Sequence, residues 1–393
     1  MNAQATETGK GRRTKVAILV NQLTPYRLPI YGALGAHNEV LIMHGGREKN
    51  RTWKLDIPPT VKTSRVWGVQ IPGKKATGVA GVSDRTYIHL NIGLLWQLPI
   101  YRPNTIITVE MGLRTVIALI YGKLARVPVW VWSGVTLHSE RNVSKGRIRL
   151  RRILVGQIKR WISYGTEATK YLESLGVARK DILQIQNCVP QETFLKIPNP
   201  SKKWFEDLPR PVILTVGQLI ARKGLDKLIE ACGRLAGQGT KFTLVIVGQG
   251  PEQERLEELA RASNIDNFLI LPNQSQPMLN EIYRAVDVFV FPTMEDIWGL
   301  VVNEAMWAGL PVLCSKYAGC AVELLPESNI FDPLSPESFD TALAMAFDGT
   351  AAVPDQSRLR TWQEVSAMIA QSIATGTPVT QHMEPESIAP RAE

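Results

Sequence analysis

Residues 287–309 read DVFVFPTMEDIWGLVVNEAMWAG, and the interpretation of the fold starts from this stretch. Residues 288–291 are a short apolar run bounded by a proline, which is typical of a buried strand. Residues 301–308 have helical spacing and stop at a glycine. We therefore expect Asp296 in the loop after a strand and Glu304 on the first turns of the next helix.

The two carboxylates of this stretch allow two interpretations. In an open parallel sheet, ligands bind in the crevice at the carboxyl ends of the strands, where Asp296 and Glu304 are expected. Beside the free N–H groups of a helix start, the pair could bind the hydroxyls of a ribose and an anionic phosphate. Acidic residues near a helix start are also common because they complement the helix dipole. The other motifs of the chain bear on this choice.

Strands and helices alternate along most of the chain, which predicts α/β domains with parallel sheets covered on both faces. A length of 393 residues suits two such domains. We expect two Rossmann-like, doubly wound domains that face one another across a central cleft. The expected divisions are a disordered tail at 1–13, an acceptor-side first domain at 14–195, a linker at 196–210, a second domain at 211–356, a helix at 357–376 that crosses back to the first domain, and a disordered tail at 377–393.

The composition is that of an ordinary soluble globular protein, with 45% hydrophobic and 21% charged residues. No apolar run reaches the roughly 18 residues that a membrane-spanning helix needs. The first residues, 1–14, are polar and lack the apolar stretch of a signal peptide. The four cysteines have no metal-ligand spacing and indicate buried, reduced thiols. We therefore expect a cytoplasmic protein.

Charge is distributed unevenly between the two halves. Residues 1–200 contain 30 lysine and arginine residues against 11 aspartate and glutamate residues, a net formal charge of +19, whereas residues 201–393 carry −10. The densest basic segment, residues 141–162, interleaves apolar and basic side chains at roughly helical spacing, which suits a helix on an anionic membrane surface. A solvated helix face packed by its apolar stripe is the main alternative. No nucleic-acid partner is expected, because no nucleic-acid-binding motif accompanies the segment.

A second strand–loop–helix unit carries glycine and two cations. Residues 212–216 form an expected strand that leads into Gly217, and the same loop contains Arg222 and Lys223. A small residue lets backbone N–H groups approach a phosphate, and either cation can neutralise its charge. This loop therefore indicates a phosphate site.

A third unit is the expected strand at residues 243–247, which leads into the turn from Gly248 to Gly250. The turn lacks the third glycine of the dinucleotide-binding fingerprint, and no acidic residue follows at the distance that suits NAD. Taken alone this signal is weak, because such turns are common packing devices.

In this order and spacing, the three segments resemble the donor-binding domain of the retaining glycosyltransferases of family 4, which have the GT-B fold. The resemblance covers about residues 210–325 and implies that Glu304 binds the ribose hydroxyls of the nucleotide. It implies that Asp296 orients the donor sugar and stabilises positive charge as the bond to phosphate breaks, and that Lys223 holds the diphosphate. The catalytic candidates are Asp296, Glu304 and His138. The implied donor-binding residues are Gly217, Gln218, Arg222, Lys223, Gly248, Glu295, Trp298, Gly299, Leu300, Val301 and Glu304.

Two positions depart from the family pattern. The first acidic residue of the family pair is usually glutamate, whereas Asp296 is one methylene shorter and has an acidic neighbour, Glu295, that could serve instead. Gln218 occupies the position of a phosphate-binding arginine, and Arg222 could supply that charge from the same loop. If it does not, the chain could be a weak or inactive nucleotide-sugar binding or scaffold subunit.

The first half of the chain resembles the family more loosely. Residues 21–29 look like a version of its first loop, so Tyr26 and Arg27 are acceptor-side candidates, with Arg27 as a phosphate or acceptor contact or, alternatively, a solvated helix-start arginine. Glu110, at the cleft end of an expected strand, is a further acceptor-side candidate. His138 is the histidine nearest to the position at which many family members carry one, and a structural role is its alternative.

The resemblance implies a retaining hexosyltransferase that moves a sugar from a UDP- or GDP-sugar to a lipid-linked glycan or polysaccharide. The net charge of +19 in residues 1–200 predicts a peripheral protein at the inner face of the membrane. The chain has no Asp-x-Asp pair to hold a divalent cation on a sugar diphosphate, so neither a metal nor another cofactor is expected. The diphosphate charge would instead fall on Lys223, Arg222 and helix starts. A GT-B epimerase or phosphorylase and a nicotinamide oxidoreductase are the alternatives that the residues favour least.

Overall fold

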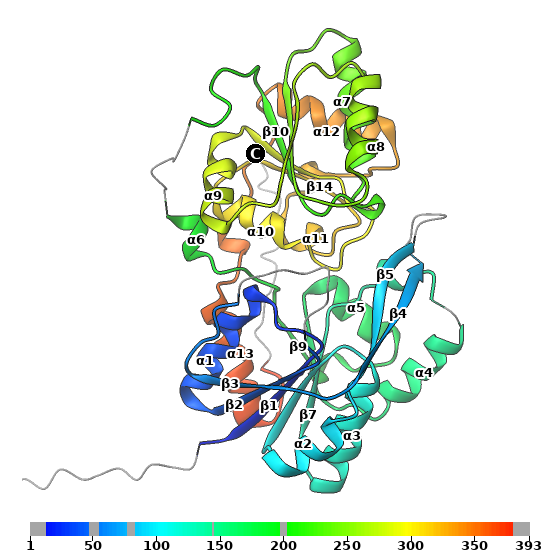
Figure 1. The fold of residues 1–393 in the computed structure, drawn as a ribbon, viewed down its shortest axis with the longest axis vertical. Helices are drawn as coiled ribbons and strands as arrows, with labels where there is room; N and C mark the ends of the chain where they lie inside the picture. Colours follow the sequence, from blue (N-terminus) through cyan, green and yellow to red (C-terminus); the bar gives the residue numbers. More distant parts are fainter. Residues whose placement is uncertain (1–12, 47–54, 77–82, 144, 197–202, 380–393) are drawn as a thin grey trace, which may run out of the picture.

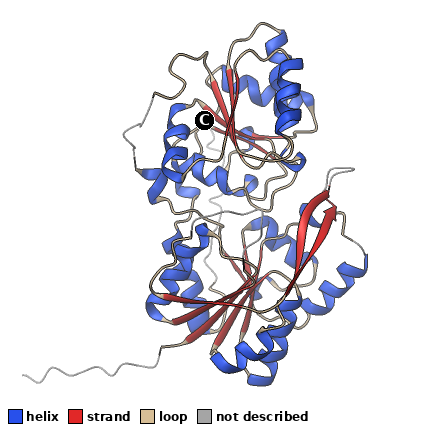
Figure 2. Cartoon of the chain, viewed as in Figure 1, coloured by secondary structure: helices blue, strands red, loops and turns tan. Residues whose placement is uncertain are grey.

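The computed structural model describes residues 13–46, 55–76, 83–143, 145–196 and 203–379. Two parallel sheets form its framework, one in each half of the chain (Figure 2). The elements of the first half are β1 (Lys15–Val20), α1 (Leu28–His37), β2 (Glu39–His44), β3 (Val61–Arg65), β4 (Val69–Ala76), β5 (Ser83–Leu90), α2 (Leu94–Tyr101), β6 (Thr105–Val109), α3 (Leu113–Ala125), β7 (Val129–Ser133), α4 (Lys145–Val155), β8 (Trp161–Ser163), α5 (Thr166–Ser174) and β9 (Ile182–Gln184).

The seven-stranded sheet of the first domain has the order β3-β2-β1-β6-β7-β8-β9, and β4 and β5 form a separate antiparallel hairpin. β1 pairs in parallel with β2 and β6, with Ile18 opposite Ile42 of β2. Its residues are continuously apolar after Lys15 because a central parallel strand is buried on both faces. Ile18 packs in the cluster that contains α1, whereas Leu19 packs with α2 and α3.

The second domain follows the short helix α6 (Glu192–Leu195). Its six-stranded sheet has the order β12-β11-β10-β13-β14-β15, with all neighbours parallel. The elements are β10 (Val212–Val216), α7 (Leu225–Gly237), β11 (Thr243–Val247), α8 (Gln253–Ala262), β12 (Phe268–Leu271), α9 (Gln276–Ala285), β13 (Val288–Phe291), α10 (Leu300–Trp307), β14 (Val312–Ser315), α11 (Ala321–Leu324), β15 (Ile330–Phe331) and α12 (Pro336–Phe347).

The winding direction reverses once in each sheet. The reversal falls between β1 and β6 in the first domain and between β10 and β13 in the second. In open parallel sheets such a switch point leaves a crevice at the carboxyl ends of the two strands, and ligands bind there. The loops that follow these four strands are therefore the places from which a ligand site can be built.

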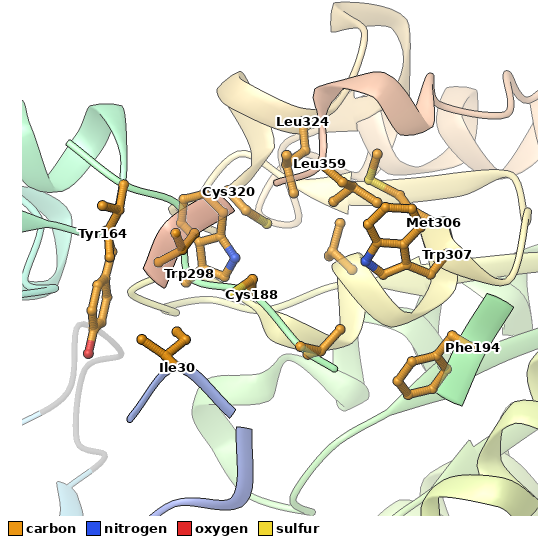
Figure 3. Close-up of a cluster of buried hydrophobic side chains, with 14 of the residues drawn as sticks. Ile30, Tyr164, Cys188, Phe194, Trp298, Met306, Trp307, Cys320, Leu324 and Leu359 are labelled. Carbon is orange, nitrogen blue, oxygen red and sulfur yellow. The ribbon is translucent and has the colours of Figure 1, made fainter. Parts of the chain in front are cut away.

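The helix α13 (Trp362–Thr375) returns to the first domain and packs on α1 (Figure 1, red beside blue). It begins with a capping box, in which Thr361 and Glu364 each accept a backbone hydrogen bond from the other. One apolar cluster continues through both domains and includes Ile30 of α1 and Trp298 of the second domain (Figure 3). The two domains are thus joined by packed side chains as well as by the chain itself.

Some strands and one helix of the structure were not predicted from the sequence. Residues 47–85 mix proline, glycine, lysine and threonine, which hides the strand pattern of β3, β4 and β5. α12 is also unexpected, although Ser335 is its N-cap and Pro336 occupies its first turn, both of which are readable start signals. The strands β10, β11 and β13 have the predicted bounds.

The basic segment, residues 141–162, is helical over only part of its length. α4 covers only Lys145–Val155, and Trp161 begins the buried strand β8. Within α4, Arg151 is buried and forms an ion pair with Glu140, so at least one cation of the segment serves the fold. Val155, Ile158 and Trp161 of the segment pack into the first domain's core, whereas Ile153 is exposed. Among the described helices, none combines the length and apolar character needed to cross a membrane.

Candidate functional site

Glycines bring the loops after β10, β11 and β13 close together. Gly224 has φ +65°, and a Cβ at this position would lie 2.2 Å from the carbonyl oxygen of Pro292. A Cβ on Gly248 would lie 1.8 Å from the carbonyl oxygen of Gly217. A side chain at either glycine would push the loops apart, so close backbone approach explains why these motifs need glycine.

Lys223 and Asp296 meet between these loops. The Nζ atom of Lys223 lies 2.6 Å from Oδ2 of Asp296, and both side chains are mostly buried. Asp296 Oδ1 accepts a hydrogen bond from the backbone N–H of Trp298 at 3.2 Å. Burial alone would raise the pKa of Asp296, but the charges of Lys223 and Arg222 outweigh it and hold that pKa below its ordinary value. The Asp296 carboxylate is therefore ionised at neutral pH and oriented from two sides.

Glu304 lies on α10, eight residues after Asp296 in the sequence. Its Oε2 accepts a hydrogen bond from the phenol of Tyr283 on α9 at 3.0 Å. Burial raises the pKa of Glu304 to about 7, and the Tyr283 hydrogen bond opposes this only in part. A carboxyl group poised near neutrality can accept hydrogen bonds from hydroxyl groups of a ligand once it ionises.

Arg222 and Glu295 connect the loops after β10 and β13 with the first domain. Arg222 Nη1 donates to the carbonyl oxygen of Glu295 at 3.0 Å. The Glu295 carboxylate lies 3.2 Å from Nη1 of Arg141, a residue of the first domain. The Glu295 side chain is thus engaged across the domain interface, and its suggested role as a substitute for Asp296 stays a prediction.

Trp298 and Gly299 position the start of α10. The Trp298 indole is buried and donates from Nε1 to Oδ1 of Asn303 at 2.8 Å. Gly299 has φ +104°, and a Cβ there would lie 2.8 Å from the Phe291 ring. The first N–H groups of a helix have no intrahelical acceptor, so Leu300 and Val301 present donors and a positive dipole end next to Asp296. This end of α10 suits an anionic ligand.

Gln218 is placed differently from the cations of its loop. Its side chain is exposed, whereas Lys223 is mostly buried and Arg222 is half-buried. That Arg222 replaces a phosphate-binding arginine at this position stays a prediction. Two cations, Arg222 and Lys223, therefore carry the positive charge of this loop.

His138 lies at the domain interface and contacts the second domain twice. Its Nε2 is 2.9 Å from the carbonyl oxygen of Met294, so this nitrogen carries the proton. Its ring stacks on Tyr317 with centroids 4.3 Å apart and an interplanar angle of 16°. Burial lowers the pKa of His138, which keeps the ring neutral at physiological pH. His138 thus lies beside the loop after β13, and its catalytic role stays a prediction.

The three acceptor-side candidates lie at the switch point of the first sheet. Tyr26 and Arg27 belong to a 3-10 turn, Pro25–Arg27, that follows β1. Glu110 directly follows β6, is exposed, and has φ +68°, which is unusual for a residue other than glycine. The carboxyl ends of β1 and β6 thus bring these candidates to one edge.

Several contacts at the site were not predicted. Glu323 of α11 accepts hydrogen bonds from the backbone N–H and the hydroxyl of Thr166, at the start of α5 in the first domain. Tyr283 and Tyr317 carried no signal, because the pairing of a ring with a distant carboxylate or imidazole depends on tertiary packing. Within the described part of the chain, no group of three or more His, Cys, Asp or Glu side chains could hold a metal ion.

Parts of the chain are similar in sequence to known glycosyltransferases. Residues 197–358 match the family model "Glycosyl transferases group 1". The chain is 32% identical to the 2-deoxystreptamine glucosyltransferase of Streptomyces kanamyceticus over 225 residues, which are 51% of this chain and 57% of that protein. It is 32% identical over 155 residues to a putative colanic acid biosynthesis glycosyltransferase of Escherichia coli, covering 35% of this chain and 37% of that protein. The chain therefore spans less than two thirds of these relatives.

Solved structures extend the likeness over both domains. The Anabaena protein HepE, solved in complex with UDP and glucose, superimposes with a TM-score of 0.68 at 16% identity, covering 92% of this chain and 100% of that one. The sucrose-phosphate synthase of Thermosynechococcus elongatus superimposes with a TM-score of 0.68 at 17% identity, covering 92% and 99%. With its two parallel sheets the chain has the GT-B fold, and its residues 197–358 are similar to the glycosyl transferases group 1.

Proposed function

We propose that this chain is a retaining glycosyltransferase of family 4 that moves a sugar from a UDP- or GDP-sugar to a glycan acceptor. The observation that carries the proposal is the meeting of Lys223, Asp296 and the start of α10 at the switch point of the second sheet. Relatives named for sugar transfer, and neighbours solved with UDP and UDP-glucose, support a nucleotide-sugar donor.

In the proposed complex each group has a separate task. The ribose hydroxyls donate hydrogen bonds to the Glu304 carboxylate. The diphosphate binds Lys223, Arg222 and the N–H groups at the start of α10. Asp296 then faces the sugar, where its negative charge stabilises the positive charge that develops at the anomeric carbon. The same cations stabilise the leaving diphosphate, so the proposal includes no divalent metal.

The domain interface supports a closed arrangement during transfer. Arg141 and His138 of the first domain contact Glu295 and Met294, which directly precede Asp296. A first domain that closes on this loop shields the activated sugar from water. We propose a catalytic role for His138 at this interface, between the loop after β13 and the acceptor.

We further propose that the acceptor is lipid-linked and that the first domain contacts an anionic membrane surface. Leu124 and Ile100 are 81% and 78% exposed, and Lys123 and Arg126 beside Leu124 are exposed cations. The ring centroids of the exposed Trp67 and Trp96 lie 6.1 Å apart. Other exposed apolar side chains of the first domain are Val69, Ile71, Ile88, Leu95, Ile120 and Ile153. Exposed apolar and aromatic side chains mixed with cations are typical of a membrane-surface contact. A solvated basic face is the alternative.

One alternative function has a specific observation in its favour. The exposed Gln218, at the position of a family arginine, would suit a subunit that binds a nucleotide-sugar without turning it over. Such a protein would bind the donor and release no free nucleotide with any acceptor. Calorimetry combined with a nucleotide-release assay separates the two.

A thermal-shift screen against UDP, GDP, ADP and their sugars tests the donor site. We expect one nucleotide to raise the melting temperature of the native protein and to have little effect on Glu304→Ala. Glu258→Ala, which removes an exposed carboxylate from α8 in the same domain, is the control and should respond like the native protein. A native protein that no nucleotide stabilises would contradict the proposal.

A further inference from the structure

Arg27 is a buried cation that is held by aromatic rings. Its side chain is only 8% exposed, and its guanidinium carbon lies 5.0 Å from the ring centroid of Trp132, 5.2 Å from that of Tyr164 and 5.6 Å from that of Tyr26. Arginine stays charged in proteins. The solvated helix-start arginine considered from the sequence is therefore not what the structure contains.

Arg27 forms no ion pair within 4.0 Å with a carboxylate of the described residues, although the charge of Glu110 acts on it from farther away. The guanidinium Nε and the hydroxyl of Thr24, three residues earlier, are both buried, and neither has a hydrogen-bond partner among the described residues. The phenol of Tyr31 also lies close to the guanidinium. Ring faces offset part of the cost of burying a cation, but they do not satisfy its N–H groups. Buried polar groups are nearly always hydrogen-bonded, so this pair of unsatisfied groups points to a missing partner.

The other arginine of this region has partners for both of its terminal nitrogens, although its Nε, like that of Arg27, has none among the described residues. Arg114 is buried and donates to the side chain of Asn21 and to the carbonyl oxygen of Val109. It thereby ties the loop after β1 to the end of β6, at the switch point of the first sheet. Arg27 and Thr24 are left as the unsatisfied groups of that loop.

The position of Arg27 relates it to the donor loops. Tyr164, which lies under the guanidinium, is followed by Gly165, and a Cβ at Gly165 would lie 2.5 Å from the Trp298 ring. Figure 3 shows Tyr164 and Trp298 at the same end of one apolar cluster. The donor diphosphate already has Lys223 and the start of α10 on the opposite domain.

We propose that Arg27 and Thr24 bind an oxyanion of the acceptor, a phosphate or a carboxylate, and so make this enzyme selective for an anionic acceptor. The inference rests on the proposed function, since it assigns the donor phosphates to the second domain. A guanidinium and a hydroxyl can together donate several hydrogen bonds to one oxyanion. The anion would neutralise Arg27 and hold the acceptor at the edge of the first sheet that faces the donor site.

The test titrates inorganic phosphate into the protein, with and without saturating UDP, and follows the melting temperature. We expect phosphate to stabilise the native protein in the presence of UDP, and its affinity to fall about tenfold or more in Arg27→Gln, because a charge-assisted contact is lost. Arg152→Gln, which removes an exposed cation from α4, is the matched control and should keep the native response. Glucuronate and glucose 1-phosphate, titrated in the same way, distinguish a carboxylate from a phosphate acceptor.

The UDP affinity of Arg27→Gln separates the acceptor from the donor. It should stay within about threefold of the native value, whereas an effect as large as the phosphate effect would assign Arg27 to the donor diphosphate and overturn the inference. Equal phosphate stabilisation of the native protein and Arg27→Gln would overturn it too, as would the absence of any phosphate effect on the native protein. If UDP fails to bind the native protein, the donor site is refuted, and the titration without UDP still tests Arg27.

Two milder variants cover the case in which Arg27→Gln does not fold. Thr24→Val removes one unsatisfied hydroxyl without changing the side-chain shape, and should weaken phosphate stabilisation severalfold without weakening UDP binding. Arg27→Lys keeps the charge but loses the planar donor group, and should weaken phosphate binding less than Arg27→Gln. Native phosphate binding by both variants would contradict the inference.

Discussion

The ammonium group of Lys223 lies 2.6 Å from the carboxylate of Asp296, so the residues expected at the diphosphate and at the sugar form one ion pair. Both side chains are mostly buried, with 14% and 16% exposed. In the proposed complex, Lys223 binds the diphosphate in place of Asp296. The ion pair is then broken, and the Asp296 carboxylate is free to face the sugar. Donor binding and the presentation of Asp296 are then coupled through a single contact.

This coupling predicts opposite effects of two substitutions. Lys223→Met should raise the Kd for UDP about 10- to 100-fold, because charge-assisted hydrogen bonds contribute roughly 1.5–3 kcal/mol. Asp296→Asn should leave UDP affinity unchanged or improve it, since Lys223 is freed, but should lower turnover by about 100-fold or more. Calorimetry and a nucleotide-release assay measure the two quantities. Normal UDP binding by Lys223→Met would rule out its diphosphate role.

Glu304 predicts a pH dependence of stability. Its pKa of about 7 in the folded chain exceeds the ordinary value of 4.5, so the protonated group stabilises the fold fully below about pH 4.5, and this contribution is lost as the pH rises through about 7. The native protein should therefore lose stability relative to Glu304→Gln between these values, by at most about 3 kcal/mol. Denaturant unfolding at several pH values measures the difference. A constant difference across this range would contradict the shift.

The lowered pKa of His138 predicts a loss of stability at low pH, the opposite of the effect of Glu304. Burial lowers its pKa from 6.5, so its contribution to stability is complete above pH 6.5 and is lost as the pH falls through the lower folded value. His138→Gln should remove part of the acid sensitivity of the melting temperature, whereas His37→Gln, at an exposed histidine of α1, should not. A fall in turnover of about 100-fold in His138→Gln at neutral pH would favour a catalytic role, and unchanged turnover a structural one.

The proposed membrane contact predicts an effect of the exposed tryptophan pair. Trp67→Ser combined with Trp96→Ser should weaken binding to vesicles that contain phosphatidylglycerol by about tenfold or more, because two aromatic side chains no longer enter the interface. Vesicle sedimentation measures the partition. Val353→Ser, at an exposed apolar residue of the second domain, is the control, and an equal loss in both proteins would argue against a specific surface.

The central strands were predictable because their residues are apolar without interruption. β1, β10 and β13 are buried on both faces, and a run of valine, isoleucine, leucine or phenylalanine marks such a strand by itself. The β4–β5 hairpin was not predictable, since it lies outside both sheets and its composition gives no alternation. The basic segment misled for a related reason: helical spacing cannot tell a cation that faces water from Arg151, which is buried beside Glu140.

Sequence order alone established the two-domain α/β fold and the loops that carry Lys223, Asp296 and Glu304, because strand, glycine turn and helix are local signals. Tertiary structure decided how these groups are paired. The Lys223–Asp296 ion pair spans two loops, the Tyr283 phenol on α9 reaches Glu304 on α10, and the rings around Arg27 come from three separate segments. Such contacts depend on which strands become neighbours at a switch point, and on the burial that follows, which no local pattern encodes.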